Sequence, residues 1–442
     1  MKNFILCCIV LFISLGGQAQ FIPMPLNYPD DGTAYMSWFT SIVDDSNVWV
    51  GTVHEGYNGY LPYDQAVRTT DGGESWEFKT IPVTGTPWIQ HLAAANANTC
   101  YYVYIDGVTY ENGIWKTSDG GDSWAKVTTN QFQGGWPNAI HCFTADTVVA
   151  VGDPNPAYFE IQITYDGGST WTRVPQANVP TALSNEWSTQ GNFFAAGNTI
   201  GFGTSHGRCV HSHDRGLHWE AVQVVDEYME FCFGDSLHGV GFRPGTAEGY
   251  YTTDNGGDTW KFLSNTNNYV LASMSSVPGI NGAYVVTALD TTVSDSLMVF
   301  FTTDFFSSFI KIDSNITNAS GINFQSPSNG WLGGSYFWHN NIHKYIGVLT
   351  SIPEPPLEQG KINIAPNPTR NLSFARIPES WIGKKAGLFI YDLNGRLVRQ
   401  RNLGMLYGMV TLDATGLPAG VFIVRIETET GESLSQKWVV RR

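Results

Sequence analysis

Cysteine is scarce in this chain of 442 residues, which holds only six, two of them at positions 7 and 8. The others are Cys100, Cys142, Cys209 and Cys232. Their spacing matches no metal-ligand motif, and it leaves three disulfide pairings open. A chain of this length needs no disulfide for stability, so we expect buried free thiols as readily as disulfides.

Long hydrophobic runs are missing from all of the chain except its first twenty residues. There, Lys2 precedes the apolar segment Phe4–Ile13, and Gly17 and Ala19 are small residues of the kind found before a signal-peptide cleavage site. The apolar segment is shorter than a membrane span requires. The two early cysteines lie inside it, where a lipid-modified cysteine is not found. We therefore expect a cleaved signal peptide at residues 1–19, an exported protein and no transmembrane segment.

Basic residues are few, with 24 Lys and Arg against 39 Asp and Glu, so the net charge is −15. The charge is uneven along the chain. Residues 361–442 hold 12 basic and 6 acidic side chains, a net +6, which leaves −21 on residues 1–360. An acidic body repels phosphate backbones, which argues against nucleic acid as a partner. The change of sign marks a domain boundary.

A short pattern with Asp, Gly and Trp recurs along the acidic part of the chain. Its copies are residues 70–76, 118–124, 165–171, 213–219 and 253–260, the last with one extra residue before Trp, and a weaker copy is 302–309. The aspartates are 40 to 50 residues apart, the length of a four-stranded propeller blade. The paired residues are Asp71 and Trp76, Asp119 and Trp124, Asp166 and Trp171, Asp214 and Trp219, and Asp254 and Trp260.

These copies resemble the Asp-box, also called the bacterial neuraminidase repeat. In such a turn the Asp accepts hydrogen bonds from backbone amides, Gly adopts positive φ, and Trp packs under the hairpin. These residues therefore have a structural role. Seven apolar segments that are rich in small residues predict seven blades. The first segment is Val48–Gly51 and the last is Gly330–Gly334. Residues 20–350 resemble a seven-bladed β-propeller of the photosystem-assembly-factor type.

The first segment after the signal peptide, Phe21–Leu26, is similar to Phe78–Val83, which follows a repeat. The seventh blade has one further strand at 342–349 but no repeat after it. We therefore predict that the N-terminal segment supplies the missing strand. Such a clasp closes the ring and removes an open sheet edge.

The C-terminal part begins after residues 351–360, a linker in which prolines exclude a strand. Residues 361–442 then contain Pro366-Asn367-Pro368, an Asp392 to Arg396 hairpin, the strand Gly416–Phe422 and a basic end. In this order the motifs closely resemble the type A sorting domain of the type IX secretion system. The length of the segment fits a small β-sandwich. The resemblance implies the secretion machinery as a partner, and release from the cell or attachment to its outer surface.

Aromatic and acidic residues precede the small-residue strand ends and are the candidate binding residues. The aromatics are Trp38, Trp88, Trp136, Trp187, Tyr228 and Tyr269. The acids are Glu186, Asp226, Glu227 and Glu230, of which we favour Glu186 and Glu227. At the mouth of a propeller channel, a ring of aromatics would stack on sugars or pack on a peptide. The alternative is that they are wedges between blades and solvated rim charges; exposure decides between the two.

Catalysis is the alternative function, because a glycoside hydrolase needs two carboxylates at a controlled separation. A sialidase is disfavoured. The Arg-Ile-Pro segment of sialidases is Phe21-Ile22-Pro23 here, and only five arginines lie in the propeller. Xyloglucan-type hydrolases also use Asp-box propellers, but they pair two of them. We therefore predict no catalytic residue, while leaving a polysaccharide hydrolase open.

Histidines gather in the fourth repeat. The cluster is His206, Cys209, His211, His213 and His218. His211 and His213 share one face of a strand, as two ligands of zinc or copper would. His213 and His218, however, replace Ser and Thr of the other repeats. We interpret them as surface substitutions, and predict no metal and no cofactor.

The sequence thus predicts an all-β protein, a seven-bladed propeller followed by a small C-terminal β-sandwich. The favoured function is a secreted or surface-attached, non-catalytic binding protein for a glycan, a peptide or a protein. An assembly factor is a weaker hypothesis, because it depends on the fold alone.

Overall fold

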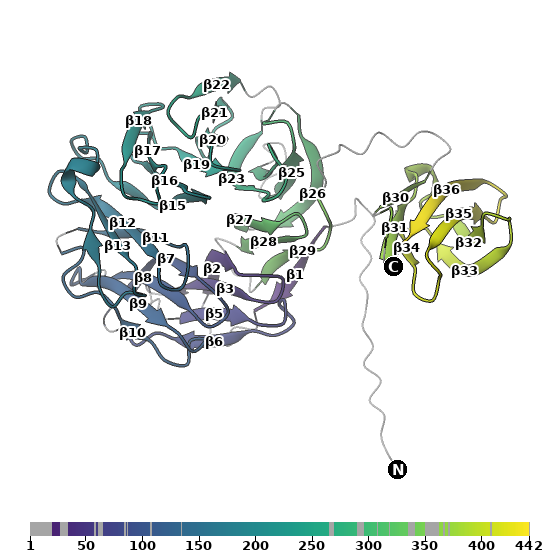
Figure 1. The fold of residues 1–442 in the computed structure, drawn as a ribbon, viewed down its shortest axis with the longest axis horizontal. Coiled ribbons are helices and arrows are strands. Elements are labelled where there is room, and N and C mark those ends of the chain that lie inside the picture. The colour runs from purple at the N-terminus through teal and green to yellow at the C-terminus, as the bar shows by residue number, and fades with distance from the viewer. Residues whose placement is uncertain are drawn as a thin grey trace, which may run out of the picture. The chain divides into compact units, whose positions relative to one another are not determined.

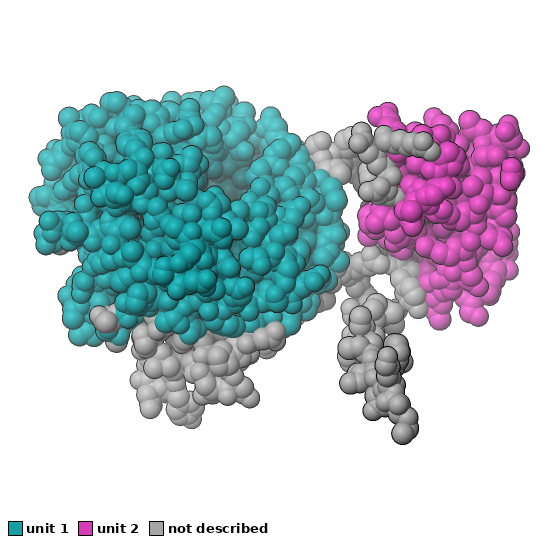
Figure 2. Space-filling view, turned by 60° about the horizontal axis from the view of Figure 1, so that its bottom comes forward, with its two compact units in different colours: residues 1–351 teal, residues 352–442 magenta. Residues whose placement is uncertain are grey.

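The computed structural model describes residues 20–26, 34–56, 59–60, 65–83, 85, 87–106, 108–133, 135–264, 269–289, 296–306, 308–317, 319–334, 341–349, 362–365, 367–369, 372–406 and 409–441. The predicted signal peptide, 1–19, and linker, 351–360, lie outside these residues. The chain divides into two compact units, residues 1–351 and 352–442 (Figure 2). Of the described residues, almost all regular structure is strand.

The described residues of unit 1 form seven antiparallel sheets arranged around a centre (Figure 1). From the innermost strand outward, blade 1 consists of β2 (Ala34–Ile42), β3 (Val48–Gly56), β5 (Gln65–Thr69) and β6 (Glu77–Thr80), and β4 (Gly59–Tyr60) pairs with β3. Blade 2 consists of β7 (Pro87–Ala94), β8 (Cys100–Asp106), β9 (Asn112–Thr117) and β10 (Ala125–Lys126). Blade 3 consists of β11 (Pro137–Cys142), β12 (Val148–Pro154), β13 (Phe159–Thr164) and β14 (Thr172–Arg173). A short 3-10 helix, η1 (Gln176–Asn178), follows β14.

The next three blades are β15 (Ser188–Ala196), β16 (Thr199–Thr204), β17 (Arg208–Ser212) and β18 (Glu220–Gln223); β19 (Glu230–Phe233), β20 (Gly239–Phe242), β21 (Gly249–Thr253) and β22 (Lys261–Ser264); and β23 (Val270–Ser276), β24 (Tyr284–Leu289), β25 (Ser296–Thr302) and β26 (Ile310–Thr317). The seventh is β27 (Ala319–Ser326), β28 (Asn329–Gly334), β29 (Asn341–Tyr345) and β1 (Phe21–Pro25). The predicted fold class and the count of seven blades are confirmed.

The N-terminal clasp is confirmed as well. Strand β1 pairs antiparallel with β29, so that Phe21 lies opposite Tyr345. The Phe21 side chain is 2% exposed, and its ring lies 5.2 Å from that of Tyr345. The backbone amide of Phe21 also donates to the Asp313 carboxylate of β26, at 2.8 Å. The first strand therefore joins the sixth and seventh blades and closes the ring.

The repeated turns connect the third and fourth strands of their blades. In the first, Asp71 Oδ1 accepts from the Thr69 hydroxyl at 2.7 Å and from the Ser75 amide at 2.9 Å. Hydrogen bonds from the Ser75 hydroxyl and amide lower the pKa of Asp71 to about 2. Gly73 has φ +94°, and a Cβ there would lie 2.7 Å from the Trp331 ring. The aspartate and glycine thus shape the turn, as their residue types suggest.

The fifth turn corrects one prediction. Asn255, not Asp254, accepts from Thr253 at 2.8 Å and from the Thr259 amide at 3.0 Å. Asn255 therefore occupies the position of Asp71, and no extra residue precedes Trp260. The amide oxygen of Asn accepts these two bonds as a carboxylate does, so the turn keeps its shape without the charge.

The four cysteines among the described residues are free thiols. Cys100 and Cys209 are buried, and Cys142 and Cys232 are half-buried. Burial raises the pKa of all four thiols above the ordinary value, which keeps them protonated. Of the two outcomes left open by the sequence, the structure has buried free thiols.

Unit 2 contains two antiparallel sheets. One has β30 (Asn363–Ala365), β31 (Leu372–Arg376) and β34 (Met409–Asp413); the other has β33 (Leu397–Met405), β32 (Lys385–Asp392), β35 (Gly420–Thr428) and β36 (Ser433–Val440), and η2 (Glu379–Trp381) precedes β32. Trp438 is fully buried in the core, and its indole donates to Ser373 at 2.9 Å. The predicted small β-sandwich is confirmed.

Candidate ligand-binding site

The blades of unit 1 present two faces. Because neighbouring strands are antiparallel, the turns after the first and third strands lie at one end of a blade, and the other connections lie at the opposite end. The repeated turns therefore occupy one face, here called the turn face. The loops after the second strands, together with the connections between blades, form the loop face.

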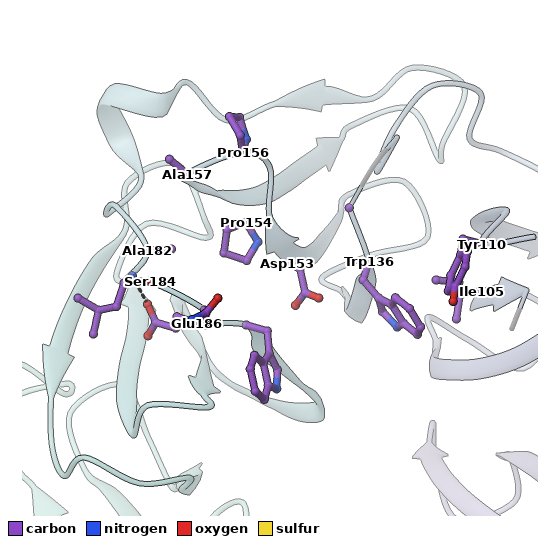
Figure 3. A pocket seen from close by; sticks show the side chains of 14 residues that line it. Ile105, Tyr110, Trp136, Asp153, Pro154, Pro156, Ala157, Ala182, Ser184 and Glu186 are labelled. Carbon is purple, nitrogen blue, oxygen red and sulfur yellow. Dashed lines mark hydrogen bonds between the residues drawn. The ribbon is translucent and has the colours of Figure 1, made fainter.

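A cleft of about 810 Å³ lies on the loop face. Its lining residues come from the segments that connect β8 to β9, β10 to β11, β12 to β13 and β14 to β15, and Figure 3 shows their side chains. The lining residues are Ile105, Tyr110, Gly135, Trp136, Asp153, Pro154, Pro156, Ala157, Ala182, Leu183, Ser184, Asn185, Glu186 and Trp187. The set has two carboxylates, three aromatic rings and no Lys or Arg, so it suits a ligand with hydrogen-bond donors and flat apolar faces.

Asp153 is the first of the two carboxylates and ends near Trp136 and Glu186 in Figure 3. Its Oδ1 accepts from Asn138 Nδ2 at 2.7 Å and from the Ser188 amide at 3.1 Å. Within the described residues, its other oxygen accepts no hydrogen bond from the protein. Burial outweighs these donors and raises the pKa of Asp153 to about 6. The carboxyl is therefore held in place through one oxygen and titrates near neutrality.

Glu186 is the second carboxylate, and its side chain is fully buried. Its Oε2 accepts from Arg208 Nη1 at 2.8 Å and from the Leu183 amide at 2.8 Å. Its Oε1 is buried and has no partner within the described residues. An oxygen in this state costs free energy until a donor reaches it. Like Asp153, Glu186 is anchored through one oxygen while the other lacks a partner.

Three aromatic side chains line the same cleft. The Trp136 and Tyr110 rings lie 6.1 Å apart at 58°, and Trp187 is 52% exposed. Tyr110 and Asn185 have φ of 60° and 58°. Residues other than glycine adopt this left-handed backbone conformation at an energetic cost, and residues in it concentrate at functional sites. The backbone of the cleft thus carries strain at two of its lining residues.

The aromatics named from the sequence fall into different environments. Trp136 and Trp187 line the cleft, and Tyr228 is 39% exposed on the loop before β19. Trp88 packs against a hydrophobic cluster shared by blades 1 and 2, and Tyr269 against one shared by blades 5 and 6, as wedges between blades would. The Trp38 side chain lies outside the described part of the structure. Of the five whose side chains the structure describes, two therefore meet at one site.

The acidic candidates also separate. Glu186 lies in the cleft, whereas Glu227 pairs with Arg243 on the surface of blade 5. The nearby Glu230 accepts from the Tyr228 hydroxyl at 2.9 Å, and burial raises its pKa. Glu227 therefore lies beside Tyr228 in the sequence and outside the cleft.

Asp153 and Tyr110 were missed by the sequence analysis. Asp153 directly follows the apolar segment Val148–Gly152, which had served only to count blades. Tyr110 lies in a loop with no repeated pattern. A rule that inspects the first polar residue after each second strand would have found Asp153; no comparable signal marks Tyr110.

Comparisons with known proteins bear on the two units separately. The family model described as "Secretion system C-terminal sorting domain" matches residues 363–441. The protein is therefore exported by type IX secretion to the cell exterior or outer surface, and its C-terminal domain interacts with that machinery. In the described residues, no helix has the length and apolar character that a membrane span requires.

Solved structures resemble unit 1 in fold. "YCF48 bound to D1 peptide" is 16% identical with a TM-score of 0.54, covering 76% of this chain and 100% of that chain. "YCF48 from Cyanidioschyzon merolae" is 13% identical with a TM-score of 0.52, covering 74% and 99%. A curated "Xyloglucanase" of Hypocrea jecorina (strain QM6a) is 25% identical over 191 residues, 33% of this chain. The match spans only 21% of the length of that relative.

Proposed function

We propose that this protein is a secreted propeller that binds a glycan in the loop-face cleft. The observation that carries the proposal is the state of the two carboxylates. Asp153 and Glu186 are each anchored through one oxygen, and the other oxygen of each has no partner among the described residues. Sugar hydroxyls are donors that match the free oxygen of Asp153, which is only partly buried, whereas a ligand reaches the fully buried Glu186 only if the loop that carries it moves.

The aromatic side chains support the same class of ligand. Sugar rings present apolar C–H faces that pack on indole and phenol rings, while their hydroxyls bond to fixed polar groups. Trp187, half exposed at the edge of the cleft, is placed to provide such a surface. The local likeness to a xyloglucanase makes xyloglucan oligosaccharides the first glycans to test.

The binding test uses the secreted protein, xyloglucan oligosaccharides and calorimetry. We expect Trp187→Ala to weaken binding about tenfold, because loss of one stacking ring costs about 1–1.5 kcal/mol. Asp153→Asn keeps the shape of the side chain and should weaken binding by a similar factor. Tyr165→Ala is the matched control, because Tyr165 is a 62% exposed aromatic on the turn face.

If Trp187→Ala and Asp153→Asn bind as tightly as the parent and the control, the proposal is contradicted. A peptide ligand is the main alternative, since one structural neighbour is a YCF48 protein bound to D1 peptide. A panel of basic peptides in the same assay separates the two ligand classes, because the acidic cleft would select basic sequences.

A polysaccharide hydrolase is a second candidate, favoured by one observation. Burial raises the pKa of Asp153 to about 6, in the range of a general acid, while Glu186 lies in the same cleft beside Arg208. If the cleft hydrolyses its ligand, incubation with polysaccharide releases reducing ends, and Asp153→Asn abolishes the release while oligosaccharide still binds. Binding without release of reducing ends excludes this candidate.

A further inference from the structure

A second polar cluster lies on the turn face, at the boundary between blades 4 and 5. His211 and His213 are on β17 and directly after it, and Asp258 is in the turn between β21 and β22. One ligand atom from each of the three lies within 4.8 Å of the other two. The sequence supplied only the two histidines, because the third residue comes from the next blade.

The two imidazoles converge on one carboxylate oxygen. His211 Nε2 lies 3.1 Å and His213 Nε2 3.4 Å from Asp258 Oδ1. His211 is fully buried, whereas His213 and Asp258 have side chains 45% and 51% exposed. Two nitrogens and one oxygen therefore meet beside solvent.

The hydrogen bonds of Thr199 determine which nitrogen of neutral His213 carries the proton. The Thr199 hydroxyl donates to the Ser236 carbonyl at 3.0 Å, since a carbonyl only accepts. Toward His213 Nδ1, at 3.1 Å, Thr199 is left to accept, so Nδ1 carries the proton. The Nε2 lone pair of neutral His213 then faces the Asp258 carboxylate. Two acceptors facing each other repel, unless a proton or a metal ion lies between them.

The turn that carries Asp258 is built to approach the histidine rings closely. Gly256 has φ +79°, and a Cβ at this position would collide with His213 Cε1. At the neighbouring Gly257, a Cβ would lie 3.5 Å from the His211 ring. Gly256 of the fifth repeated turn therefore allows the turn that carries Asp258 to lie close to His213, in addition to shaping the hairpin.

We propose that His211 Nε2, His213 Nε2 and Asp258 Oδ1 bind a divalent transition-metal ion such as Zn²⁺. Two imidazoles and one carboxylate are a common zinc ligand set, and water from the exposed side completes a tetrahedron. The hydrogen bond from His213 Nδ1 to Thr199 is the kind of support that orients a metal-binding imidazole, whereas His211 Nδ1 is buried without a partner among the described residues. The ion would replace the unfavourable contact at Asp258 and link blade 4 to blade 5.

The test uses the full secreted chain, stripped with chelator and titrated with Zn²⁺ alone. We expect one Zn²⁺ per molecule and a melting temperature that rises with zinc concentration, because an ion that binds only the folded state stabilises it. His213→Ala and Asp258→Asn should each weaken zinc binding at least tenfold. His238→Ala is the control, since His238 forms a similar pair with Asp235, at 2.8 Å, outside the cluster.

Two results would overturn the proposal. One is zinc binding of the same stoichiometry and affinity in His213→Ala and Asp258→Asn as in the parent. The other is no zinc binding by the parent protein at pH 7.5. Melting curves of the metal-free variants verify that each is folded before titration.

Discussion

At the residue scale, the cleft contains two acidic side chains whose burial costs free energy. Asp153 is an acid in a desolvated position, and Glu186 keeps a buried oxygen without a partner among the described residues. Such groups reduce stability unless a ligand satisfies them. Their presence together in one cleft is the reason to look for a ligand there.

Asp153→Asn is expected to stabilise the protein at neutral pH. The folded pKa of Asp153, about 6, is above the ordinary 3.8, so ionisation destabilises the fold as pH rises from about 4 through 6. Asn keeps the Oδ1 acceptor for Asn138 and Ser188 and removes the charge. The gain should approach about 3 kcal/mol above pH 6, since one pKa unit is about 1.4 kcal/mol.

Urea unfolding at pH 7.5 and at pH 4 measures this effect. At pH 4, where Asp153 is protonated in the folded protein, the two proteins should have nearly equal stability. A gain of the same size at both pH values would mean that the charge of Asp153 is not the cause.

At the element scale, the short strand β1 closes the propeller ring. Strand β1 is the outermost strand of the seventh blade, although it is first in the chain. Its Phe21 amide donates to Asp313 in blade 6, and the Phe21 ring packs against Phe324 and Tyr345. Ring closure therefore depends on contacts between the two ends of the propeller sequence.

Phe21→Ala should destabilise the propeller by about 3–5 kcal/mol, because it removes a large buried ring from a packed cluster. Ile22→Ala, the neighbouring residue on the same strand, is 36% exposed and should cost much less. Thermal melts of both variants make the comparison. Similar losses in the two would show that the strand contributes through its backbone alone.

At the scale of the whole molecule, the sorting domain and the proposed binding sites lie in different units. The match to a sorting domain covers residues 363–441, whereas the cleft and the histidine cluster lie in unit 1. The separation allows each to be tested without the other.

A chain ending at residue 360 should retain a folded propeller but remain in the periplasm of a bacterium with type IX secretion. Immunoblots of culture medium, intact cells and periplasm measure the distribution. The full chain is the control, and a truncated chain found outside the cell would contradict the assignment of sorting to residues 363–441.

The sequence by itself determined the number of blades, the N-terminal clasp and the sorting domain. These depend on local patterns, namely strand periodicity, turn residues and short motifs, which neighbouring residues specify. It also misplaced one turn residue, because Asp254 and Asn255 are adjacent and either can accept the same hydrogen bonds.

Only the tertiary structure decided which residues meet. Asp153 joins Glu186 from a different loop, and Asp258 joins His211 and His213 from a different blade. Nor did the sequence distinguish the exposed Trp187 from the packed Trp88, because it did not show that Trp88 lies inside strand β7 whereas Trp187 directly precedes β15. Exposure and the separation of charges result from packing between blades, and the pattern within one blade does not encode them.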